Sequence, residues 1–464
     1  MEKYTAYKPS GIKWIGDIPE HWVLINLKRV FSQRFSGTWG EEPKNNSNDR
    51  ICLRVADFDY SNLRFKELPE YTIRNYKDDE ICKYTLSKGS ILIEKSGGGE
   101  KSPVGRSVFY DLKFDNALFA NFLECLVVRD NYNPKFIVYY LSVMYSKRVI
   151  WKYVRQTTGI QNLTLSSLLS MESIYVPNIS EQLSIVAFLE KATANIDAYI
   201  KQTEQEINTL NELKQAEIAN VVTKGLNPNA PMKDSGIAWI GEIPDHWQCN
   251  QLRKYLKLVS IKNKPNEQLL SVTREQGVIV RNVESKEENH NFIPEDLSGY
   301  KYVRKGQFAI NKMKSWQGSY GVSNFDGIVS PAYFVCELNN INKEFFSWAI
   351  RSKAFIGFFT QMSKGIRVDQ WDLSPIALKQ IPFFEPPITE QQQIVDYIES
   401  KTSKIEEYIV ALKSEIEQIQ EYKQRLISDV VTGKVDVRNV AVEKMEDIPE
   451  EEIEETEELE NSEE

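Results

Sequence analysis

The chain has 464 residues, too many for a single hydrophobic core, so three or four structural units are expected. It has no long apolar run and no basic, apolar and small-residue start, and we expect neither a membrane span nor a signal peptide. Five cysteines without paired spacing predict free thiols in a reducing cytoplasm, and three histidines leave so little material that no metal site is expected.

The net charge of −9 is unevenly distributed. Residues 443–464 carry thirteen carboxylates against one lysine, a block of −12 that leaves +3 for the rest of the chain. Residues 23–177 carry +5 and residues 248–382 carry +7. Two mildly basic segments suggest a polyanionic partner, although a solvated surface explains charge of this size equally well. The acidic block predicts a disordered tail, because its carboxylates repel one another and it has few apolar residues to bury.

A motif near the start of the chain occurs twice. It reads SGIKWIGDIPEHW from Ser10 to Trp22 and SGIAWIGEIPDHW from Ser235 to Trp247, with ten of thirteen positions identical. Its glycine, proline and tryptophan residues predict a turn-rich segment that is pinned onto a following domain. His21 and its counterpart in the second copy are interpreted as hydrogen-bonded braces of the turn rather than as catalytic bases.

Residues 23–177 are predicted to form a mixed α and β globule. The runs ICLRVADF, SILIEK, SVFY and LECLVV are separated by Gly, Pro, Asn and Asp, which is typical of short strands. A helix is expected to start at Asn133 and Pro134, because Asn caps helices and Pro is favoured in their first turn.

Residues 181–222 predict a long helix, and they recur 209 positions later as residues 390–431. Apolar residues at spacings of three and four continue over five heptads, which indicates a coiled-coil seam. The predicted seam residues are Val186, Leu189, Ile196, Ile200, Ile207, Leu210 and Val221 in the first copy, and Val395, Ile398, Ile405, Ile409, Leu412, Ile416, Ile419, Leu426 and Val430 in the second.

The two long helices have matching end signals. Ser180 and Thr389 are the N-cap candidates, and Gly225 and Gly433 mark the far ends. The linker between Gly225 and Ser235 spans only about 30 Å when extended. A parallel pairing would need a return of roughly 60 Å, so we expect the helices to run antiparallel.

Residues 248–382 repeat the frame of the first globule with different side chains. The runs LLSVT, QFAINK and YFVCEL predict strands, and a helix is expected to start at Asn342. Phe345 in this helix matches Phe136 at the same offset of 209 that relates the long helices. The chain is therefore an internal repeat in which the frame is shared and the surface differs.

The repeated opening motif, the SEQ or TEQ start of each long helix and its VVTKG or VVTGK end resemble the specificity subunit of type I restriction-modification systems, over about residues 8–435. The resemblance implies an α+β fold with two α/β target-recognition domains, separated by two long helices that form an antiparallel intramolecular coiled coil with pseudo-two-fold symmetry. The implied division is a first recognition domain at 1–177, a first helix at 178–225, a linker and second recognition domain at 226–382, a second helix at 383–435 and an acidic tail at 436–464.

The resemblance also implies a non-catalytic subunit of a complex that methylates DNA and defends against foreign DNA. Each recognition domain would read one half of a bipartite site in double-stranded DNA, while the helices set the spacer and dock two modification subunits. Restriction subunits, acting as ATP-dependent translocases and nucleases, are a further implied partner. S-adenosylmethionine, ATP and Mg²⁺ are expected in these partners and not in this chain, which has no GxxxxGKS/T, GxGxxG or Asn-Pro-Pro-aromatic motif.

Two alternatives stay open at the level of sequence. One is a nuclease or methyltransferase with an unrecognised site, fused to a recognition module. The other is a coiled-coil scaffold that binds no nucleic acid.

Base reading requires side chains that donate or accept hydrogen bonds, and phosphate contacts require cations on exposed loops. By position, the DNA-binding candidates are Arg54, Asp57, Lys95, Lys101, Arg106, Gln161 and Asn162 in the first globule, and Thr273, Arg274, Lys312, Lys314, Trp316, Lys364 and Arg367 in the second. For any single candidate, a solvated surface role is the simpler interpretation.

Overall fold

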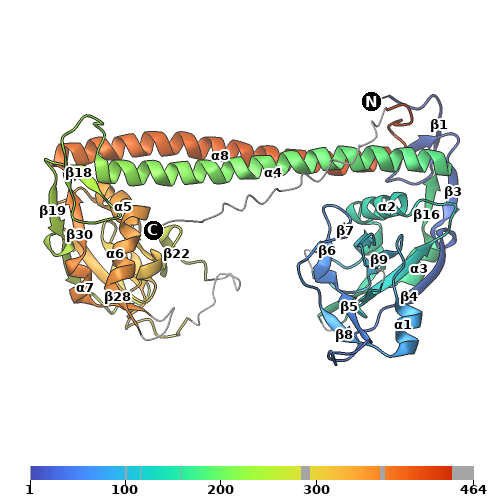
Figure 1. Ribbon diagram of the computed structural model, residues 1–464, viewed down its shortest axis with the longest axis horizontal. Helices are drawn as coiled ribbons and strands as arrows, with labels where there is room; N and C mark the ends of the chain where they lie inside the picture. Colours follow the sequence, from blue (N-terminus) through green and yellow to red (C-terminus); the bar gives the residue numbers. More distant parts are fainter. Residues whose placement is uncertain are drawn as a thin grey trace, which may run out of the picture. The chain divides into compact units, whose positions relative to one another are not determined.

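The structure is a computed structural model that describes residues 2–99, 102–114, 116–157, 159–283, 293–365 and 371–440. The chain divides into two compact units, each with one globule and part of both long helices (Figure 1). Unit 1 comprises Met1–Lys201 together with Ile416–Glu464, and unit 2 comprises Gln202–Glu415. The acidic residues 443–464 lie outside the described residues.

The globule of unit 1 is built from short strands with a few helices. Its strands are β1 (Tyr7–Pro9), β2 (Asp17–Pro19), β3 (Val23–Asn26), β4 (Phe31–Ser36), β5 (Asp49–Leu53), β6 (Phe58–Asp59), β7 (Arg64–Phe65), β8 (Ile73–Asn75), β9 (Ile91–Glu94), β10 (Ser96–Gly97), β11 (Ser107–Phe109), β12 (Leu118–Phe119), β13 (Leu123–Val128), β14 (Val154–Thr157), β15 (Ile160–Leu163) and β16 (Ser173–Val176). Its helices are η1 (Leu27–Val30), η2 (Val55–Asp57), α1 (Asp78–Tyr84), α2 (Pro134–Ser146), η3 (Ile150–Tyr153) and α3 (Leu165–Met171).

The central sheet of unit 1 has the strand order β4-β13-β9-β11-β7-β6. Strand β9 lies in its middle and is antiparallel to both neighbours. Ile91 and Ile93 point into the core that contains Phe136 of α2, whereas Leu92 points into a second core with Phe119. Because both faces of β9 are covered, its side chains are apolar in succession rather than alternately.

The globule of unit 2 likewise combines short strands with a few helices. Its strands are β17 (Met232–Asp234), β18 (Glu242–Pro244), β19 (Gln248–Gln251), β20 (Leu256–Val259), β21 (Leu270–Thr273), β22 (Gly277–Val280), β23 (Lys301–Val303), β24 (Phe308–Ile310), β25 (Tyr320–Val322), β26 (Gly327–Val329), β27 (Phe334–Leu338), β28 (Ser363–Lys364), β29 (Asp372–Leu373) and β30 (Pro382–Glu385). Its helices are η4 (Leu252–Lys254), η5 (Ser315–Gln317), α5 (Lys343–Arg351), α6 (Lys353–Met362) and α7 (Pro375–Gln380).

The sheet of unit 2 has the strand order β20-β27-β24-β25, all antiparallel. Helices α2 and α5 take corresponding places beside the two sheets, and each begins as the sequence predicts. The Asn133 side chain accepts from the backbone N of Lys135, and the Asn342 side chain accepts from the backbone N of Phe345 at 2.9 Å. The expected helix starts are therefore confirmed, and so are the expected strands, except that the run ICLRVADF is a strand only as far as Leu53 and continues as the 3-10 helix η2.

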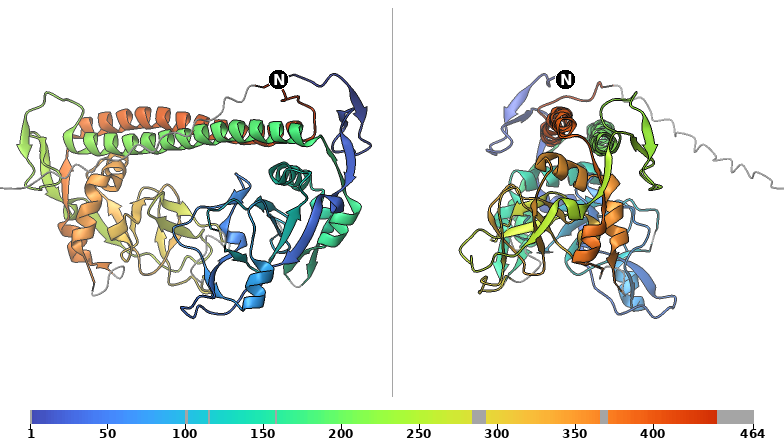
Figure 2. Two further views of the ribbon diagram at one scale, coloured as in Figure 1. Left: turned by 45° about the vertical axis from the view of Figure 1, so that its right-hand side comes forward. Right: turned by 90° about the vertical axis from the view of Figure 1, so that its left-hand side faces the viewer.

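The long helices are α4 (Ile179–Lys224) and α8 (Ile388–Val431), which lie side by side (Figures 1 and 2). In unit 1, residues 185–189 of α4 share a hydrophobic core with residues 426–431 of α8. In unit 2, residues 218–222 of α4 share a core with residues 394–398 of α8. Residue numbers increase along α4 from the first core to the second, while those of the contacting residues in α8 decrease. The two helices therefore pair antiparallel, as predicted. Every predicted seam residue is buried or half-buried.

Two ion pairs in the seam are related by the repeat. Lys423 Nζ lies 2.6 Å from Asp197 Oδ1 in unit 1, and Lys214 Nζ lies 3.2 Å from Glu406 Oε1 in unit 2. Both partners are displaced by the same 209 positions. The first pair is more buried, with side-chain exposures of 9% and 30% against 18% and 61%.

The N-cap prediction for the long helices is wrong. Helix α4 begins at Ile179, so Ser180 lies inside it, and the Asn178 side chain accepts from the backbone N of Glu181 at 3.0 Å instead. Thr389 likewise lies inside α8, which begins one residue before it. The far ends are as predicted, because Gly225 and Gly433 follow the helices in left-handed backbone conformation, with φ of 73° and 74°.

A glutamate at the start of each long helix holds the opening motif. In unit 1, Glu181 accepts hydrogen bonds from Tyr4 Oη at 2.8 Å and Trp22 Nε1 at 3.0 Å, and its Oε2 lies 2.8 Å from His21 Nε2. In unit 2, Glu390 accepts from Trp247 Nε1 at 3.1 Å, and its Oε2 lies 2.8 Å from the ring nitrogen of the second motif's histidine. The predicted role of the histidines as braces is confirmed, and the acid that recurs beside them comes from the distant SEQ and TEQ motifs.

The glutamine that follows each of these glutamates fixes a second contact. Gln182 donates from Nε2 to the carbonyl of Pro177 at 2.9 Å and accepts from the backbone N of Asn133 at 2.8 Å. Gln391 makes the equivalent contacts with the carbonyl of Pro386 and the backbone N of Asn342, at 2.8 and 3.0 Å. Each glutamine thereby ties a long helix to the start of the helix in its globule. The EQ dipeptide joins three segments that are distant in sequence.

The segment after α8 belongs to unit 1 and packs on the start of the chain. Asp436 donates its backbone N to the carbonyl of Glu2 at 3.0 Å, and Val437 is buried in the first core. The Arg438 guanidinium lies 4.9 Å from the ring centroid of Tyr4. The start of the first globule is thus completed by residues from the end of the repeat.

None of the helices in the described parts of the chain is long and apolar enough to cross a membrane. All five cysteines are free, and Cys52, Cys125 and Cys336 are buried.

Candidate nucleic-acid interface

A small three-stranded sheet in unit 1 carries several predicted residues. Its order is β10-β15-β14, and its register places Ser96, Asn162 and Arg155 directly opposite one another. Directly opposed residues lie on the same face of a sheet. Ser96 Oγ donates to Asn162 Oδ1 at 2.7 Å, and Asn162 and Arg155 are exposed. This face presents an amide and a guanidinium side by side.

The neighbouring residue Gln161 points to the other face. It is 6% exposed, and its Oε1 accepts from the backbone N of Val104 at 3.3 Å. A Cβ atom added to Gly98 would lie 2.9 Å from the same oxygen. Gln161 therefore holds the glycine turn against the sheet, and its amide is oriented inward.

Lys95 precedes β10 and is half-buried. Its Nζ donates to Ser36 Oγ at 2.6 Å, and its carbonyl accepts from the backbone N of Leu163 at 2.8 Å. The lysine thus couples the small sheet to the central sheet and keeps its charge near the surface.

Asp57 is buried and is used within the globule. Its carboxylate accepts from the backbone N of Arg54 at 2.8 Å and pairs with the guanidinium of Arg54 at 3.1 Å. The Asp57 side chain is 2% exposed and that of Arg54 is 41% exposed. Of the two predicted contacts, Arg54 presents the more accessible group.

Arg106 is held by a buried carboxylate. Its Nε and Nη2 donate to the two oxygens of Glu94 at 3.0 and 2.9 Å, and its guanidinium stacks 3.7 Å from the ring centroid of Tyr60. The hydroxyl of Tyr60 also donates to Glu94. Burial and this hydrogen bond raise the pKa of Tyr60, which therefore stays protonated as a donor. The bidentate pair orders the strands behind the small sheet.

In unit 2, one predicted lysine lies in a short hairpin and another lies beside it. The hairpin pairs Ser363 with Leu373 and Lys364 with Asp372. Lys312 Nζ donates to Asp372 Oδ2 at 2.8 Å, and Lys364 is exposed. Asp372 is not among the sequence candidates, although it contacts Lys312 and lies opposite Lys364 in the hairpin.

Trp316 and Lys314 belong to a turn beside this hairpin. The Trp316 ring lies 5.2 Å from that of Trp371, and its carbonyl accepts from Thr360 Oγ1 at 3.0 Å. Its indole nitrogen is buried and has no hydrogen-bond partner among the described residues. Lys314 is exposed at the start of η5.

Thr273 and Arg274 lie at the tip of the β21–β22 hairpin. Thr273 Oγ1 closes the turn by donating to the carbonyl of Gly277 at 3.2 Å, and the side chain of Arg274 is 69% exposed. Arg351 of α5 supports the turn from below, donating to the carbonyls of Arg274 at 3.1 Å and Glu275 at 2.8 Å. Arg351 is a positioning residue that the sequence did not indicate.

Lys101 and Arg367 lie outside the described residues. Among the other candidates, the structure brings Lys95, Gln161 and Asn162 together in unit 1, and Lys312, Lys314, Trp316 and Lys364 together in unit 2. The predicted residues Thr273 and Arg274 belong to a separate hairpin. DNA contact by any of them stays a prediction.

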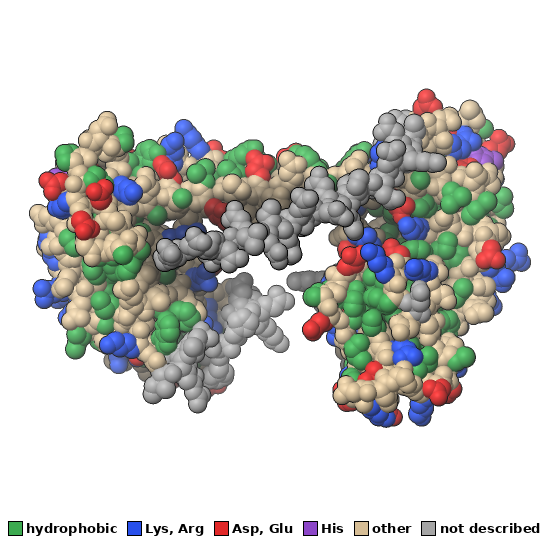
Figure 3. All heavy atoms as spheres, in the orientation of Figure 1, with side chains coloured by type: hydrophobic (Ala, Val, Ile, Leu, Met, Phe, Trp, Pro, Cys, Tyr) green, Lys and Arg blue, Asp and Glu red, His purple; other side chains and the backbone are tan. Residues whose placement is uncertain are grey.

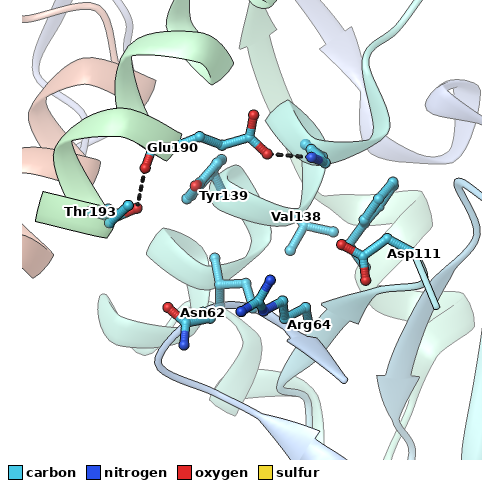
Figure 4. A pocket seen from close by; sticks show the side chains of 11 residues that line it. Asn62, Arg64, Asp111, Val138, Tyr139, Glu190 and Thr193 are labelled. Atoms are coloured by element: carbon cyan, nitrogen blue, oxygen red, sulfur yellow. Dashed lines mark hydrogen bonds and ion pairs between the residues drawn. The ribbon is translucent and has the colours of Figure 1, made fainter. Parts of the chain in front are cut away.

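A cavity of about 220 Å³ lies between the first globule and α4 (Figure 4). Arg64 and Asp111 come from the globule side, and Glu190 and Thr193 come from the helix. Lys135 of α2 forms an ion pair with Glu190 at its edge. Both charge signs are present in the lining, so the cavity has no preference for a polyanion.

On the face drawn in Figure 3, basic side chains are spread over both globules and are mixed with acidic ones. The surface therefore does not present one dominant charged patch on this face. If this face binds nucleic acid, it would do so through particular side chains more than through bulk charge.

Comparisons with known proteins agree with the repeat and the fold. Residues 19–209 match the family described as the type I restriction modification DNA specificity domain. The MjaX type I restriction enzyme specificity subunit of Methanocaldococcus jannaschii is 24% identical over 446 residues, covering 93% of this chain and 98% of that protein. The MjaVIII specificity subunit of the same organism is 25% identical over 285 residues, covering 58% of this chain and 63% of that protein.

A chain in a solved structure of a type I restriction-modification system has the same fold. It aligns with a TM-score of 0.62 at 12% identity, covering 90% of this chain and 99% of that one. The family match spans the first globule and much of α4, and the likeness to the relative extends through both halves of the repeat. The chain is thus similar to type I restriction-modification specificity subunits in its first recognition domain and over both halves of its repeat.

Proposed function

We propose that this chain is the DNA-recognition subunit of a type I restriction-modification complex, in which each globule reads one half of a bipartite DNA site. The observation that carries the proposal is the internal repeat. Two globules share one scaffold, are anchored by the same glutamate and glutamine contacts, and differ in the side chains they expose. A common frame with different surfaces is what two different half-sites require.

The subunit is non-catalytic, as its similarity to specificity subunits indicates, and methylation, ATP hydrolysis and cleavage belong to partner subunits. We propose two modification subunits, one for each half of the pseudo-symmetric coiled coil, and restriction subunits as further partners. S-adenosylmethionine would be supplied with the modification subunits, and ATP and Mg²⁺ with the restriction subunits. A cytoplasmic location also stays a proposal, supported by five free cysteines.

Selection from a randomised duplex library tests the central proposal. The purified full-length chain should enrich two short conserved blocks separated by an unspecified spacer of constant length. Binding should weaken steeply as salt is raised, because phosphate neutralisation releases counterions. A single conserved block, or no enrichment, would contradict the bipartite model.

The two alternatives are distinguished by the same preparation. A fused nuclease or methyltransferase would cleave or methylate the selected duplex without partners, when supplied with Mg²⁺ or S-adenosylmethionine. A scaffold that does not bind nucleic acid would show no salt-dependent binding to duplex DNA. We expect binding without turnover.

A further inference from the structure

The two globules contain matched hairpins whose outward residues differ in chemistry. In unit 1 the hairpin is β14–β15, with Arg155 opposite Asn162. In unit 2 it is β28–β29, with Lys364 opposite Asp372. The repeat's offset of 209 relates Arg155 to Lys364, but Asn162 and Asp372 are 210 positions apart because the second hairpin is one residue longer. The equivalence comes from backbone hydrogen bonds.

The first of these bonds joins each hairpin to the strand beside it. The backbone N of Leu163 donates to the carbonyl of Lys95 at 2.8 Å, and that of Leu373 donates to the carbonyl of Lys312 at 3.1 Å. Leu163 and Leu373 are both buried. Lys95 and Lys312 therefore occupy the same position in the two scaffolds.

A second bond, one residue earlier, supports the same alignment. The backbone N of Glu94 donates to the carbonyl of Arg106 at 2.9 Å, and that of Asn311 donates to the carbonyl of Ser319 at 3.0 Å. After the hairpin, Thr164 and Ser374 stand at the N-caps of α3 and α7. The matched positions thus run continuously from the strand through the hairpin to the next helix.

The alternation of the strands decides which hairpin residues face outward. The residues beside the matched leucines are Asn162 and Asp372, and both are exposed. Their cross-strand partners Arg155 and Lys364 are also exposed and make no ion pair with any residue that the structure describes. Each hairpin thus presents one cation and one hydrogen-bonding side chain on a single outward face.

We propose that these hairpins are the base-reading centres of the two globules, a proposal that rests on the proposed DNA-recognition function. Arginine and lysine donate to the acceptors of guanine, asparagine pairs with adenine, and aspartate accepts from the amino group of cytosine. Arg155 and Asn162 would therefore read guanine and adenine in one half-site. Lys364 and Asp372 would read guanine and cytosine in the other.

The lysines that precede the hairpins have a supporting role. Lys312 Nζ holds Asp372 at 2.8 Å, and Lys95 Nζ is held by Ser36 at 2.6 Å. Both orient the strand end on which the hairpin rests, and their charges favour a nearby phosphate. Asp372, an acidic residue at a polyanion surface, is tolerated because this lysine compensates its charge.

The test is duplex selection with full-length variants. Asn162→Ala and Arg155→Ala should each abolish the preference at one position of one conserved block, a loss of about 10- to 100-fold in discrimination. Asp372→Ala and Lys364→Ala should do the same in the other block only. The block read by the untouched globule serves as an internal control for folding.

Two further kinds of variant complete the test. Lys152→Ala and Lys353→Ala remove exposed cations outside the hairpins, one in each globule, and should leave both conserved blocks unchanged. Asn162→Asp should move the preference at its position from adenine toward cytosine, which unfolding cannot imitate. If the parent chain enriches a bipartite site but the hairpin variants enrich the same bases, this inference is wrong while the proposed function stands. If the parent chain enriches no bipartite site, the proposed function itself fails.

Discussion

The buried glutamate at the start of α4 shows how one side chain can hold a whole segment. Glu181 receives hydrogen bonds from a tyrosine and a tryptophan and contacts a histidine, and its side chain is 3% exposed. Hydrogen bonds to a charged group are stronger than those between neutral groups, and leaving buried donors unpaired costs free energy. Burial and the bond to Glu181 raise the pKa of Tyr4, so this tyrosine remains a donor.

We predict that Glu181→Gln lowers the stability of the opening motif by about 2 kcal/mol, because the amide replaces two acceptor oxygens with one. Hydrogen exchange of peptides from residues 1–24, followed by mass spectrometry, measures the local effect. Glu390→Gln is the matched control: its side chain is 19% exposed and it lacks a contact equivalent to Tyr4 in the described part of unit 2, so its effect should be smaller. Equal effects in the two motifs would contradict this account.

At the scale of the element, the repeat supplies a matched pair of ion pairs within the coiled coil. Lys423 lies in the seam, where it pairs with Asp197 and also donates to the carbonyl of Ser61 at 3.0 Å. Lys214 occupies the same seam position and pairs with the more exposed Glu406. Exposed pairs contribute little because water screens them, whereas removing one partner of a buried pair leaves an uncompensated charge.

We predict that Lys423→Ala destabilises the coiled coil of unit 1 by about 2 kcal/mol, and that Lys214→Ala costs less than about 1 kcal/mol in unit 2. Urea unfolding combined with hydrogen exchange of α4 peptides separates the two effects. The double variant Asp197→Asn with Lys423→Met should recover part of the loss, because it removes both charges. A larger effect at Lys214 would refute the dependence on burial.

The long helices also lead to a prediction about the spacer. Thr203 and Leu412 lie at matching positions of the repeat, and four residues inserted after each would lengthen both helices by about 6 Å. If the coiled coil sets the spacer, the unspecified segment of the DNA site should lengthen by roughly two base pairs at 3.4 Å each. Both conserved blocks should be retained. Duplex selection with the insertion variant measures this, and an unchanged spacer or altered blocks would reject the ruler model.

At the scale of the whole molecule, each unit contains residues from both halves of the repeat. Unit 1 needs the end of α8 and the segment after it, because residues 426–431 and Val437 belong to its core. Neither half of the repeat is thus a self-sufficient domain. The continuous order of motifs in the sequence does not reveal this exchange.

We predict that deleting residues 235–434 leaves only weak DNA binding. The remaining globule would make at most a single-module contact, because its core lacks residues 426–431 of α8 unless the seams of two fragments pair. The second contact would no longer be intramolecular at high effective concentration. Fluorescence anisotropy on the selected duplex measures the affinity, and sedimentation detects a dimer of fragments, which the near-identical seams favour. Truncation after Val442 is the control, since it removes only the acidic block. Full affinity from a monomeric fragment would overturn the two-globule model.

The sequence by itself determined the repeat, the long antiparallel helices, their seam and the starts of α2 and α5. These features depend on local periodicity, on capping chemistry and on the reach of a short linker, all of which can be read along the chain. The cap of α4 was misassigned because Ser180 and Asn178 are both good N-cap residues, and the helix begins at the earlier of the two.

Only the tertiary structure decided which polar residues are available. Gln161 and Asn162 are adjacent and equally polar, but strand register turns the first inward and the second outward. Asp57 is also unavailable, because its carboxylate accepts hydrogen bonds from the backbone and the guanidinium of Arg54. Arg155 and Asp372 entered the site only through strand pairing. A side chain's face follows from the partner across the sheet, and that partner is distant in sequence, so composition and spacing could not reveal it.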